Sequence, residues 1–554
     1  MSKEFALPKT IIIIGAALAG PVAASRAREI DGKARIILLE RNTRVSYAMA
    51  GLSFHLSGEV KSLDDLNRER EDYFKRVYNI EVHTKTEVTK IDSKNKILYL
   101  NSSDDLTELK YDTLIFATGA ASIHPTGLPK TTQNFRYFRT LDDLAEIQRH
   151  IKTGKNKIVV LGGGSMGIEA VDGCVRGGAE VTLIEKSDQI LPGFTKNIAT
   201  MAEHMMSSSI SIHKNVQNIE YISKNDLVSE VIIDGKKIKI DFIVSAIGVR
   251  PRTELLAQTG VKLHKDGTIK INSYCQTNIK DIYACSICVS LPTRFGHMWI
   301  PQAAVSDKTA QVAGANAAGS KVKLREFSSS MIIRTPNAEV GKVGLSQNQA
   351  QMYFGKDKIG KALVHGTDKE SYFPTNAPVI LEILYHKKNH RILGLSALGN
   401  NIKSRLDAFA SAFTNRQTLE DIANLDFAYS PAFGTSRDVL NVVATVALQK
   451  ESKLTESLEP IDLLMQRKNF FILDVGSQPT NTVKTNHFLP VESIRTMIPE
   501  LLQKFKASGA TTIATLSESG RRGHLAYRIL KEHHIPVINI NGGIKLYSLY
   551  ANKT

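Results

Sequence analysis

A glycine-rich stretch in residues 157–185 has the residue types and the spacing that bind a dinucleotide. After an apolar run, Gly162 permits a tight turn, Gly164 lets the backbone approach a pyrophosphate, and Gly167 lets a helix pack closely on a strand. The helix N-terminus that follows offers unpaired N–H groups to the phosphates. Glu185 ends the next apolar run, where it can bind an adenosine ribose and would repel a 2′-phosphate. The stretch therefore predicts binding of NADH in preference to NADPH; the alternative is a structural βαβ unit without a ligand.

The N-terminus repeats this organisation. An apolar run over residues 11–14 leads into Gly15, Ala17 and Gly20, and the next apolar run ends at Glu40. Ala17 stands where the second glycine is expected, and its methyl group crowds a phosphate without having to block it. A basic start followed by apolar and small residues resembles a signal peptide, but the repeated pattern predicts a first dinucleotide-binding unit in a cytoplasmic protein.

Two further segments predict the buried strands that close these units. Residues 111–120 read YDTLIFATGA and end in Thr118 and Gly119, and residues 241–251 read DFIVSAIGVRP and contain Gly248. Strands that alternate with helix-length segments predict an α/β fold with parallel sheets.

The composition bounds the class of protein. At 554 residues with 42% apolar residues, the chain is long enough for roughly three or four globular domains. The net charge of +16 is compatible with an acidic partner, but the basic residues are spread along the chain and no nucleic-acid-binding motif is present. Four cysteines exclude a secreted disulfide scaffold, and no apolar run is long enough to span a membrane.

Together, the two units and their closing strands resemble the pyridine nucleotide-disulfide oxidoreductases. VSYAMAGLSFHLSGE at 45–59 resembles the active-site helix of the coenzyme A-disulfide reductase and NADH oxidase branch, and TNIKDIYACSIC at 277–288 resembles its third FAD segment. Residues 327–447 resemble its dimerisation domain. From about residue 461 the chain is similar to a rhodanese domain, with ILDV at 472–475 and SESGRRGHLAYRIL at its active loop.

The resemblance implies two interleaved Rossmann-like domains for FAD and NAD(P)H, an α+β dimerisation domain, a C-terminal rhodanese α/β domain and a homodimer. The implied boundaries are 1–122 and 252–325 for the FAD domain, 123–251 for the NAD domain, 326–447 for dimerisation, 448–460 for a linker and 461–554 for the rhodanese-like domain. The implied cofactor-binding positions are Gly15, Ala17, Gly20, Glu40, Thr118, Gly119, Gly162, Gly164, Gly167, Glu185, Gly248 and Ile287.

The sequence departs from the family at the position of the redox cysteine. The family pattern is S-x-A-N-C-G-L-P, and here Ser46 and Gly51 set a register that places Met49 at the asparagine and Ala50 at the cysteine. Alanine has no nucleophile, so thiol exchange is not expected at this position.

The rhodanese loop of the family, C-x-x-G-x-R, is also altered. Ser517 stands at the cysteine and cannot carry a persulfide, so sulfur transfer is not expected. Gly520, Arg521 and Arg522 can form an anion-binding loop, which Glu518 opposes. An inert loop and an anion site remain alternatives.

The third FAD segment has lost the aspartate that bonds the ribityl chain in the family, because Ile287 stands there. In the same segment, Cys285 and Cys288 have the C-x-x-C spacing of a redox dithiol, or are two small buried residues. A zinc site is disfavoured, since His297 is the only additional ligand nearby.

Other family positions are retained. Tyr372 and Tyr429 match the tyrosines that the partner subunit places at the thiol-substrate site, or they pack in the dimer interface. Arg26, Ser46 and Met49 match a groove for coenzyme A. Glu169, just after the second glycine turn, is expected to help at the nicotinamide side or to face solvent.

These features predict an FAD-dependent NADH oxidoreductase that resembles coenzyme A-disulfide reductase and NADH oxidase, with no thiol step at Ala50 and an inactive rhodanese domain. Electrons would pass from NADH through the flavin to oxygen, a quinone or another small acceptor, with a coenzyme A derivative as a further candidate ligand. The alternative is a non-catalytic nucleotide-binding sensor or scaffold. A serine hydrolase at Ser517 is a weak third hypothesis, because only His524 lies near it in sequence.

Overall fold

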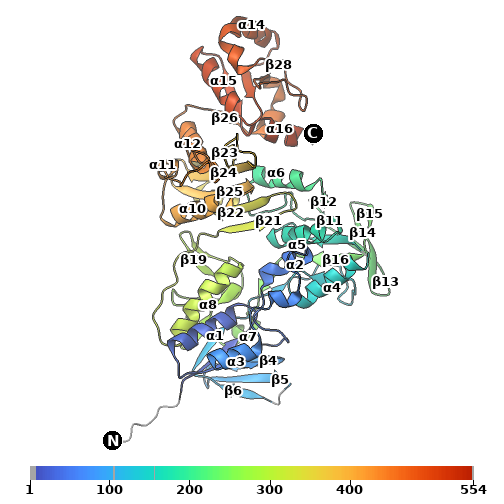
Figure 1. Cartoon of the computed structure of the whole chain (residues 1–554), viewed down its shortest axis with the longest axis vertical. Helices are drawn as coiled ribbons and strands as arrows, with labels where there is room; N and C mark the ends of the chain where they lie inside the picture. The colour runs from blue at the N-terminus through green and yellow to red at the C-terminus, as the bar shows by residue number, and fades with distance from the viewer. Residues whose placement is uncertain (1–7, 104–105, 155, 552–554) are drawn as a thin grey trace. The chain divides into compact units, whose positions relative to one another are not determined.

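The computed structural model describes residues 8–103, 106–154 and 156–551, which form two compact units (Figure 1). The first unit comprises Met1–Lys186 and Ile210–Phe327, and the second comprises Ser187–Ser209 and Ser328–Thr554. Within the described residues, no helix combines the length and the apolarity needed to cross a membrane.

The first unit contains two five-stranded parallel sheets. One has the strand order β18-β7-β1-β2-β3, with β18 (Ile282–Ala284), β7 (Thr113–Phe116), β1 (Thr10–Ile14), β2 (Arg35–Leu39) and β3 (Ile80–His83). The other has the order β12-β11-β10-β16-β9, with β12 (Ser211–His213), β11 (Glu180–Ile184), β10 (Lys157–Leu161), β16 (Phe242–Ser245) and β9 (Phe135–Tyr137). The apolar runs found in the sequence are the central strands β1 and β10, and their buried side chains explain the near-continuous hydrophobic pattern.

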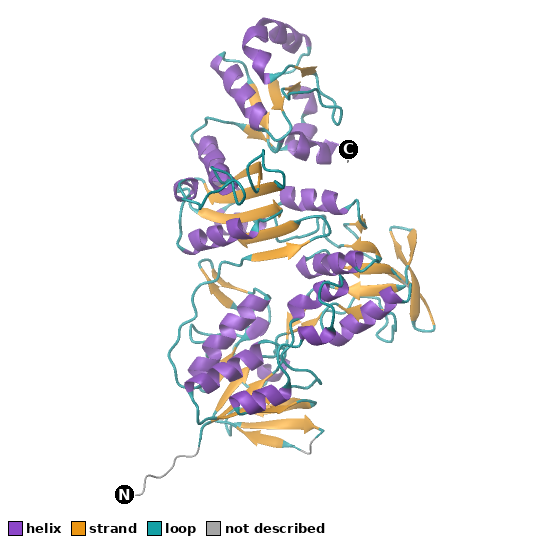
Figure 2. Cartoon of the chain, viewed as in Figure 1, coloured by secondary structure: helices purple, strands orange, loops and turns teal. Residues whose placement is uncertain are grey.

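Helices cover these sheets (Figure 2). They are α1 (Ala19–Ile30), α2 (Leu52–Leu56), α3 (Glu71–Tyr78), α4 (Leu141–Lys152), α5 (Ser165–Arg176), α7 (Glu254–Ala257) and α8 (Ala303–Ala317). Helix α8 packs against α1 at Gly314, where a Cβ would lie 2.2 Å from the carbonyl oxygen of Ala23. This contact brings residues 303–317 back onto the first sheet, so the first sheet is completed by segments far apart in the sequence.

Smaller antiparallel sheets complete the first unit. They are β4 (Thr86–Asp92), β5 (Ile97–Ser102) and β6 (Glu108–Lys110); β13 (Glu220–Lys224), β14 (Leu227–Ile233) and β15 (Lys236–Lys239); β8 (Ala120–Ser122) with β17 (Val249–Pro251); and β19 (Leu291–Thr293) with β20 (Gly296–Met298). The β8–β17 pair joins the segments that follow the two closing strands, β7 and β16.

The second unit begins with α6 (Lys196–Met206) and an antiparallel sheet of order β21-β22-β25-β24-β23. Its strands are β21 (Met331–Arg334), β22 (Glu339–Gly344), β23 (Ile359–Thr367), β24 (Pro378–His386) and β25 (Ile392–Gly399). Its helices are α9 (Gln347–Phe354), α10 (Lys403–Thr414), α11 (Leu419–Ala423) and α12 (Val439–Glu451).

The C-terminal part of this unit is a parallel sheet of order β26-β30-β29-β27-β28. The strands are β26 (Ser457–Leu458), β27 (Phe470–Asp474), β28 (His487–Phe488), β29 (Thr512–Leu516) and β30 (Val537–Ile540), and the helices are α13 (Pro460–Met465), α14 (Ile494–Ala507), α15 (Arg521–Glu532) and α16 (Gly543–Ala551). Alternate residues of β27 and β29 enter two separate apolar clusters, one with α14 and α15 and one with α13 and α16. Both faces of the sheet are therefore covered.

Candidate functional site

The two glycine turns of the first unit have the same backbone geometry. Gly15 and Gly162 each follow the central strand of a parallel sheet, with φ of +100° and +99°. A Cβ would lie 2.7 Å from the carbonyl oxygen of Ala117 at the first turn and 2.6 Å from that of Ala246 at the second. Because positive φ and close backbone contact both disfavour a side chain, each turn requires glycine at this position.

The third glycine of each motif allows the helix to pack on its own turn. A Cβ on Gly20 would lie 1.8 Å from the carbonyl oxygen of Gly15, and a Cβ on Gly167 would lie 1.8 Å from that of Gly162. Neither contact can be relieved without moving backbone. These two pairs fix where the N-termini of α1 and α5 lie relative to their strands.

The turns differ at the middle position. A Cβ on Gly164 would meet no heavy atom within 4 Å, so glycine leaves open space there. The equivalent residue of the first turn is Ala17, which is half-buried and whose carbonyl oxygen accepts a hydrogen bond from Tyr47 N at 3.0 Å. The second turn therefore leaves its backbone open to a pyrophosphate, whereas a methyl group stands beside the first.

A buried acid lies behind each turn. Glu40 Oε2 accepts a hydrogen bond from Ala16 N at 2.8 Å, and its Oε1 accepts from the backbone and side-chain nitrogens of Asn42. Glu185 Oε2 accepts from Gly163 N at 2.5 Å. Each carboxylate is thus held beside its glycine turn, which is where the ribose of a bound dinucleotide lies in this type of fold.

A cavity of about 240 Å³ opens beside the first turn. The polar and glycine residues that line it are Gly15, Glu40, Arg41, Thr86, Glu87, Thr118, Arg252 and Glu254. It lies at the carboxyl ends of β1 and β2, where open parallel sheets bind nucleotides. Arg252 was missed by the sequence analysis, although it directly follows the conspicuous segment that ends at Pro251.

Ala50 lies in a short 3-10 turn, Met49–Gly51, that leads into α2. Its side chain is exposed and Met49 is half-buried. A Cβ on Gly51 would lie 2.3 Å from Leu66 Cδ2, so glycine allows that leucine to pack under the turn. The expected helix is therefore present, but Ala50 precedes its first α-helical residue.

Helix α2 is held against α5 of the other sheet's domain. A Cβ on Gly173 would lie 2.8 Å from Ser53 O, and one on Gly177 would lie 2.7 Å from Leu56 O. His55 is buried and hydrogen-bonds through Nδ1 to Val60 O at 2.7 Å. The spacing of the two glycines lets α5 approach the segment that follows Ala50, so both dinucleotide turns share one packed unit.

Glu169 lies on α5 one turn before Gly173 and is half-buried. Burial, reinforced by the nearby carboxylate of Asp172, raises the pKa of Glu169 to about 7. Asp172 itself is buried and accepts a hydrogen bond from Arg176 Nε at 2.8 Å. Glu169 can therefore hold or release a proton near neutral pH, which a solvent-facing glutamate cannot do.

The expected groove residues have different surroundings. Ser46 is buried with φ of +51°, and its backbone N donates to Ala16 O at 2.8 Å. Arg26 forms an ion pair with Glu29 at 2.7 Å on α1. These contacts place Ser46 beside the first glycine turn and Arg26 on the surface of α1; a shared groove stays a prediction.

Tyr372 and Tyr429 lie in the second unit, on two loops that meet. Their side chains are 71% and 50% exposed, and Phe433, which follows Tyr429 in the same loop, is 81% exposed. The hydroxyl of Tyr429 donates to Glu370 Oε1 at 3.2 Å, and Ser436 N donates to the same oxygen at 2.8 Å. Its pKa is raised to about 12 by loss of solvation, by Glu370 and by Tyr372. The structure therefore brings the two tyrosines together on an exposed aromatic surface.

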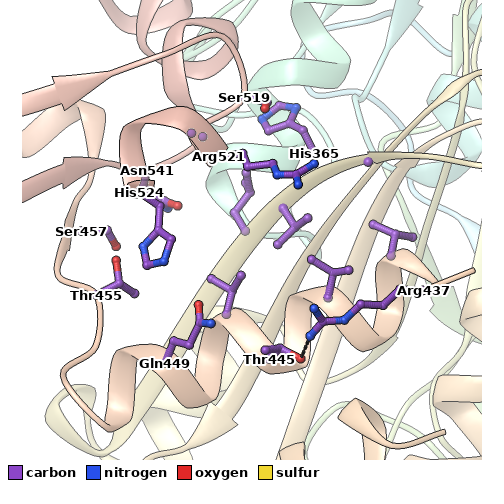
Figure 3. Close-up of a pocket in the computed structure, with 18 of the residues that line it drawn as sticks. His365, Arg437, Thr445, Gln449, Thr455, Ser457, Ser519, Arg521, His524 and Asn541 are labelled. Carbon is purple, nitrogen blue, oxygen red and sulfur yellow. Dashed lines mark hydrogen bonds between the residues drawn. The ribbon is translucent and has the colours of Figure 1, made fainter. Parts of the chain in front are cut away.

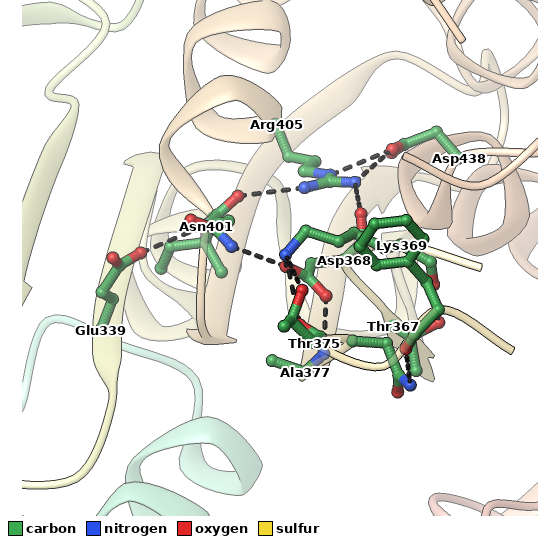
Figure 4. Close-up of polar contacts among 12 residues, drawn as sticks. Glu339, Thr367, Asp368, Lys369, Thr375, Ala377, Asn401, Arg405 and Asp438 are labelled. Carbon is green, nitrogen blue, oxygen red and sulfur yellow. Dashed lines mark hydrogen bonds and ion pairs between the residues drawn. The ribbon is translucent and has the colours of Figure 1, made fainter. Parts of the chain in front are cut away.

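A buried ion-pair network fixes both tyrosine loops (Figure 4). Arg405 donates to Asp438 Oδ2 through Nε at 3.0 Å and Nη2 at 2.7 Å, and to Asp368 O through Nη2 at 3.1 Å. Asp368 in turn accepts from Ala377 N and from Asn401 Nδ2, both at 2.6 Å. Asp438 also caps α12. Sequence reasoning missed this network because its members are joined only by the tertiary fold.

Ser517 begins the loop that leads into α15. It is buried, its Oγ accepts a hydrogen bond from Gly523 N at 3.0 Å, and its carbonyl oxygen accepts from Ile544 N at 2.8 Å. Gly520 adopts φ of +91°, which turns the chain into the helix. The loop has the form of a cradle at a helix N-terminus, but the hydroxyl is already bonded inward.

The charges around this loop are partly satisfied. Arg522 donates to Val475 O at 3.1 Å and pairs with Glu492. Glu518 pairs with Lys545 at 3.1 Å, which weakens its expected opposition to an anion. Arg521 is exposed at the start of α15.

A cavity of about 590 Å³ lies between this loop, β23 and α12 (Figure 3). Its polar lining includes His365, Arg437, Gln449, Arg521, His524 and Asn541, and Leu363, Val439 and Val442 add apolar surface. Arg437 Nη2 donates to Thr445 Oγ1 at 2.7 Å. Burial, with the positive charge of Lys545, lowers the pKa of His365 to about 4, so this histidine is neutral at physiological pH.

Comparisons with known proteins agree with this architecture. The family profile "Pyridine nucleotide-disulphide oxidoreductase" matches residues 9–317, and the profile of the family's dimerisation domain matches residues 331–438. The chain belongs to the pyridine nucleotide-disulphide oxidoreductase family. The family is FAD-dependent and uses NAD(P)H, and its members are oxidoreductases.

Several relatives are similar over most of their length. An NADH oxidase of Methanocaldococcus jannaschii is 28% identical over 448 residues, covering 80% of this chain and 99% of the relative. A CoA-dependent NAD(P)H sulfur oxidoreductase of Pyrococcus furiosus is 28% identical over 445 residues, covering 79% and 99%. The solved structure of an NAD-dependent persulfide reductase from A. fulgidus superposes with a TM-score of 0.91 at 26% identity, covering 97% of this chain and 100% of that one.

FAD, the cofactor of the family, fits the residues at its adenosine half. The first glycine turn, the buried acid Glu40 and the adjoining cavity supply the space and the hydrogen-bonding groups that an adenine dinucleotide needs. The fit is incomplete at Ile287, an apolar side chain 8% exposed that faces Gly119. Its neighbour Ser286 has φ of +75°, a conformation that favours glycine.

Cys285 and Cys288 do not have the environment of a redox dithiol. Both are fully buried, no α-helix begins at them, and Cys288 Sγ lies 3.0 Å from Cys285 O. Burial raises the pKa of Cys288 to about 11 and raises that of Cys285 well above its usual value. The premise that a helix dipole lowers a thiol pKa here is therefore wrong, and both are protonated thiols in the core.

Proposed function

We propose that this protein oxidises NADH and passes the electrons through FAD directly to a small acceptor, with no cysteine relay. The observation that carries the proposal is the pair of equivalent glycine turns in one packed unit, with Ala50 on the segment that joins them. FAD, when bound, supplies the chemistry of hydride acceptance and onward electron transfer. Oxygen, a quinone and a coenzyme A derivative are the candidate acceptors or ligands.

The residues of the chain then have distinct roles. Glu185, held against Gly163 N, selects NADH by accepting ribose hydrogen bonds and repelling a 2′-phosphate. Glu169, with its pKa of about 7, holds a proton at the nicotinamide side of α5. Both roles need only the second turn and its helix.

The absence of a thiol relay follows from the proposed register. If Ala50 occupies the redox-cysteine position of the family, nothing there can form a mixed disulfide. The chain has four cysteines, and all are buried. The name NADH oxidase of the M. jannaschii relative supports transfer to a small acceptor, whereas the name of the P. furiosus relative supports a coenzyme A-linked ligand.

We infer that the chain acts as a homodimer. The dimerisation profile covers residues 331–438, and the exposed side chains of Tyr372, Tyr429 and Phe433 gather on that domain. A second copy would cover these aromatic groups and present the tyrosines to the partner's site. The exposed aromatic surface is also explained if these residues only pack in the dimer interface. The variants Tyr372→Phe and Tyr429→Phe distinguish the two roles, because they keep the rings for packing and remove the hydroxyl groups.

We also infer that residues 461–554 form a rhodanese-like domain without sulfurtransferase activity. The doubly covered parallel sheet and the loop before α15 support the assignment. Ser517 replaces the sulfur acceptor, and its Oγ is bonded to Gly523 N. Arg522 already bonds to Val475 and Glu492, which leaves Arg521 and Gly520 to bind an anion. A loop that binds no anion is therefore the preferred alternative.

The decisive experiment uses the purified full-length protein. A yellow protein whose visible flavin band is bleached by NADH under anaerobic conditions, and restored by oxygen, is the expected result. A colourless protein that binds NADH but catalyses no oxidation would instead support a nucleotide-binding sensor or scaffold.

Ala50→Cys tests the register. A thiolate at this position would lie beside the flavin and change its visible spectrum, and reduction of coenzyme A disulfide would become measurable. The matched control is Ala48→Cys, two residues earlier in the same segment, which should leave the spectrum unchanged. Coenzyme A disulfide reduction by the unmodified protein that survives replacement of both Cys285 and Cys288 would contradict the proposal.

A further inference from the structure

Arg252 projects into the cavity beside the first glycine turn. The cavity lining places it with Gly15, Glu40 and Thr118. Its backbone is held on both sides, because Thr118 Oγ1 donates to Arg252 O at 2.7 Å and Arg252 N donates to Gly119 O at 3.0 Å. The closing segment of the FAD sheet therefore fixes the position from which this side chain reaches the cavity.

The guanidinium of Arg252 forms no direct ion pair among the described residues, although Glu40 and Glu254 lie close enough to attract it. Within residues 8–103, 106–154 and 156–551, no carboxylate forms an ion pair with it. Two further arginines, Arg41 and Arg139, lie within electrostatic reach. Burial, with repulsion from these two arginines, lowers the pKa of Arg252 to about 10. Such a half-buried cluster of like charges is unfavourable unless an anion joins it.

The nearby carboxylates attract Arg252 but bond to other groups, Glu254 to Arg250. Glu40 has both oxygens engaged, Oε2 with Ala16 N and Oε1 with Asn42. Arg41 pairs with the exposed Glu87 at 3.5 Å, and Arg139 donates through Nη2 to Ala120 O at 3.0 Å. Of the two arginines that line the cavity, Arg41 is therefore paired with Glu87, and Arg252 is left without an ion pair among the described residues.

We propose that Arg252, supported by Arg41 and Arg139, neutralises the diphosphate of FAD. The assignment rests on the proposed flavin function and deepens it. The guanidinium fork matches phosphate oxygens and acts over a longer distance than a backbone N–H. At this turn the methyl group of Ala17 crowds the backbone approach, so a side-chain cation provides affinity that the glycine turn alone does not.

The experiment compares ligands that do and do not carry the diphosphate. Binding of FAD, ADP and adenosine to the flavin-free full-length protein is measured by calorimetry for the unmodified chain, Arg252→Gln and Arg252→Lys. Arg252→Gln should weaken FAD and ADP binding by about tenfold or more, the range of a charge-assisted hydrogen bond. Adenosine binding should not change, and Arg252→Lys should recover part of the ADP affinity.

The matched control is Arg35→Gln. Arg35 lies at the opposite end of β2 and pairs with Glu81 at 2.8 Å, so its loss changes the net charge equally without touching the cavity. ADP affinity that is insensitive to Arg252→Gln, or that rises, would overturn the assignment and show that Arg252 merely fills the cavity. Failure of the unmodified protein to bind FAD, ADP and adenosine would instead refute the flavin function itself.

Discussion

The first and second glycine turns share a backbone and differ in the chemistry around it. Gly15 and Gly162 have the same positive φ, and the third glycine of each motif approaches its turn to the same distance. The middle position is alanine in the first turn and glycine in the second, and only the second helix carries an acid two residues after its third glycine. The fold thus constrains the residues that shape the turn, whereas the residues that face the ligand can diverge.

The largest effect is expected where the two turns are identical. Gly20→Ala and Gly167→Ala each place a methyl group 1.8 Å from a carbonyl oxygen, which displaces the helix and destabilises the protein by about 1–3 kcal/mol or more. Gly20→Ala should abolish FAD retention, measured by the flavin absorbance. Gly167→Ala should abolish NADH binding, measured by calorimetry, while FAD is retained. Loss of both cofactors in both variants would show that the turns are not independent.

Replacing Glu185 tests the acid of the second turn. Glu185→Ala removes the carboxylate that Gly163 N holds, so NADH binding should weaken by about tenfold and the preference over NADPH should disappear. The measurement is the dissociation constant of each nucleotide. Unmodified protein that binds NADPH as tightly as NADH would contradict the role assigned to Glu185.

Exchanging the middle residues makes each turn resemble the other. Gly164→Ala should weaken NADH binding and Ala17→Gly should strengthen FAD binding, each by about threefold, because a methyl group beside the pyrophosphate is added or removed. A Cβ at position 164 would meet no heavy atom within 4 Å, so the melting temperature of Gly164→Ala should match that of the unmodified protein. Equal changes in FAD and NADH affinity from one substitution would argue against this interpretation.

Glu169 should give the smallest effect, visible as pH dependence. Its pKa is about 7 in the folded protein and near its ordinary value when unfolded, so the folded state binds the extra proton between these values. Stability should therefore fall as pH rises from about 4.5 to about 7. Glu169→Gln should flatten this part of the profile in urea unfolding, and should also shift the pH dependence of flavin reduction by NADH. A variant with an unchanged profile in both measurements would assign Glu169 no titrating role.

The sequence predicts the two dinucleotide units well because local patterns determine them. An apolar run, a glycine turn and a terminal acid reappear as β1, α1, β2 and Glu40, and as β10, α5, β11 and Glu185. The segment that resembles a signal peptide is the central strand of a sheet, with Ile11 to Ile13 fully buried. The repetition of this pattern in residues 157–185 was enough to predict a strand, not a signal peptide, at this position.

Features that depend on tertiary contacts could not be predicted. Asn197 lies inside the range 123–251 that was predicted as the NAD domain, yet it donates to Glu382 Oε1 at 2.9 Å and to Glu459 Oε2 at 3.0 Å, and accepts from Tyr550 at 3.0 Å. These bonds hold Ser187–Ser209 in the second unit, so the predicted continuous NAD domain over 123–251 is interrupted there. The lack of an ion pair for Arg252 among the described residues arises in the same way, because no local pattern shows which carboxylates pair with a side chain. The dithiol hypothesis failed because spacing alone does not reveal that Cys285 and Cys288 are buried.

The central claim is that electrons reach the acceptor without a cysteine relay, and an anaerobic reductive titration tests it most directly. The purified flavoprotein is titrated with NADH, and the flavin band is followed against the equivalents added. We expect complete bleaching with one equivalent per flavin, because Ala50 cannot store a second electron pair and the four cysteines are buried. Uptake of a second equivalent before the endpoint would reveal a redox-active thiol pair and contradict the account.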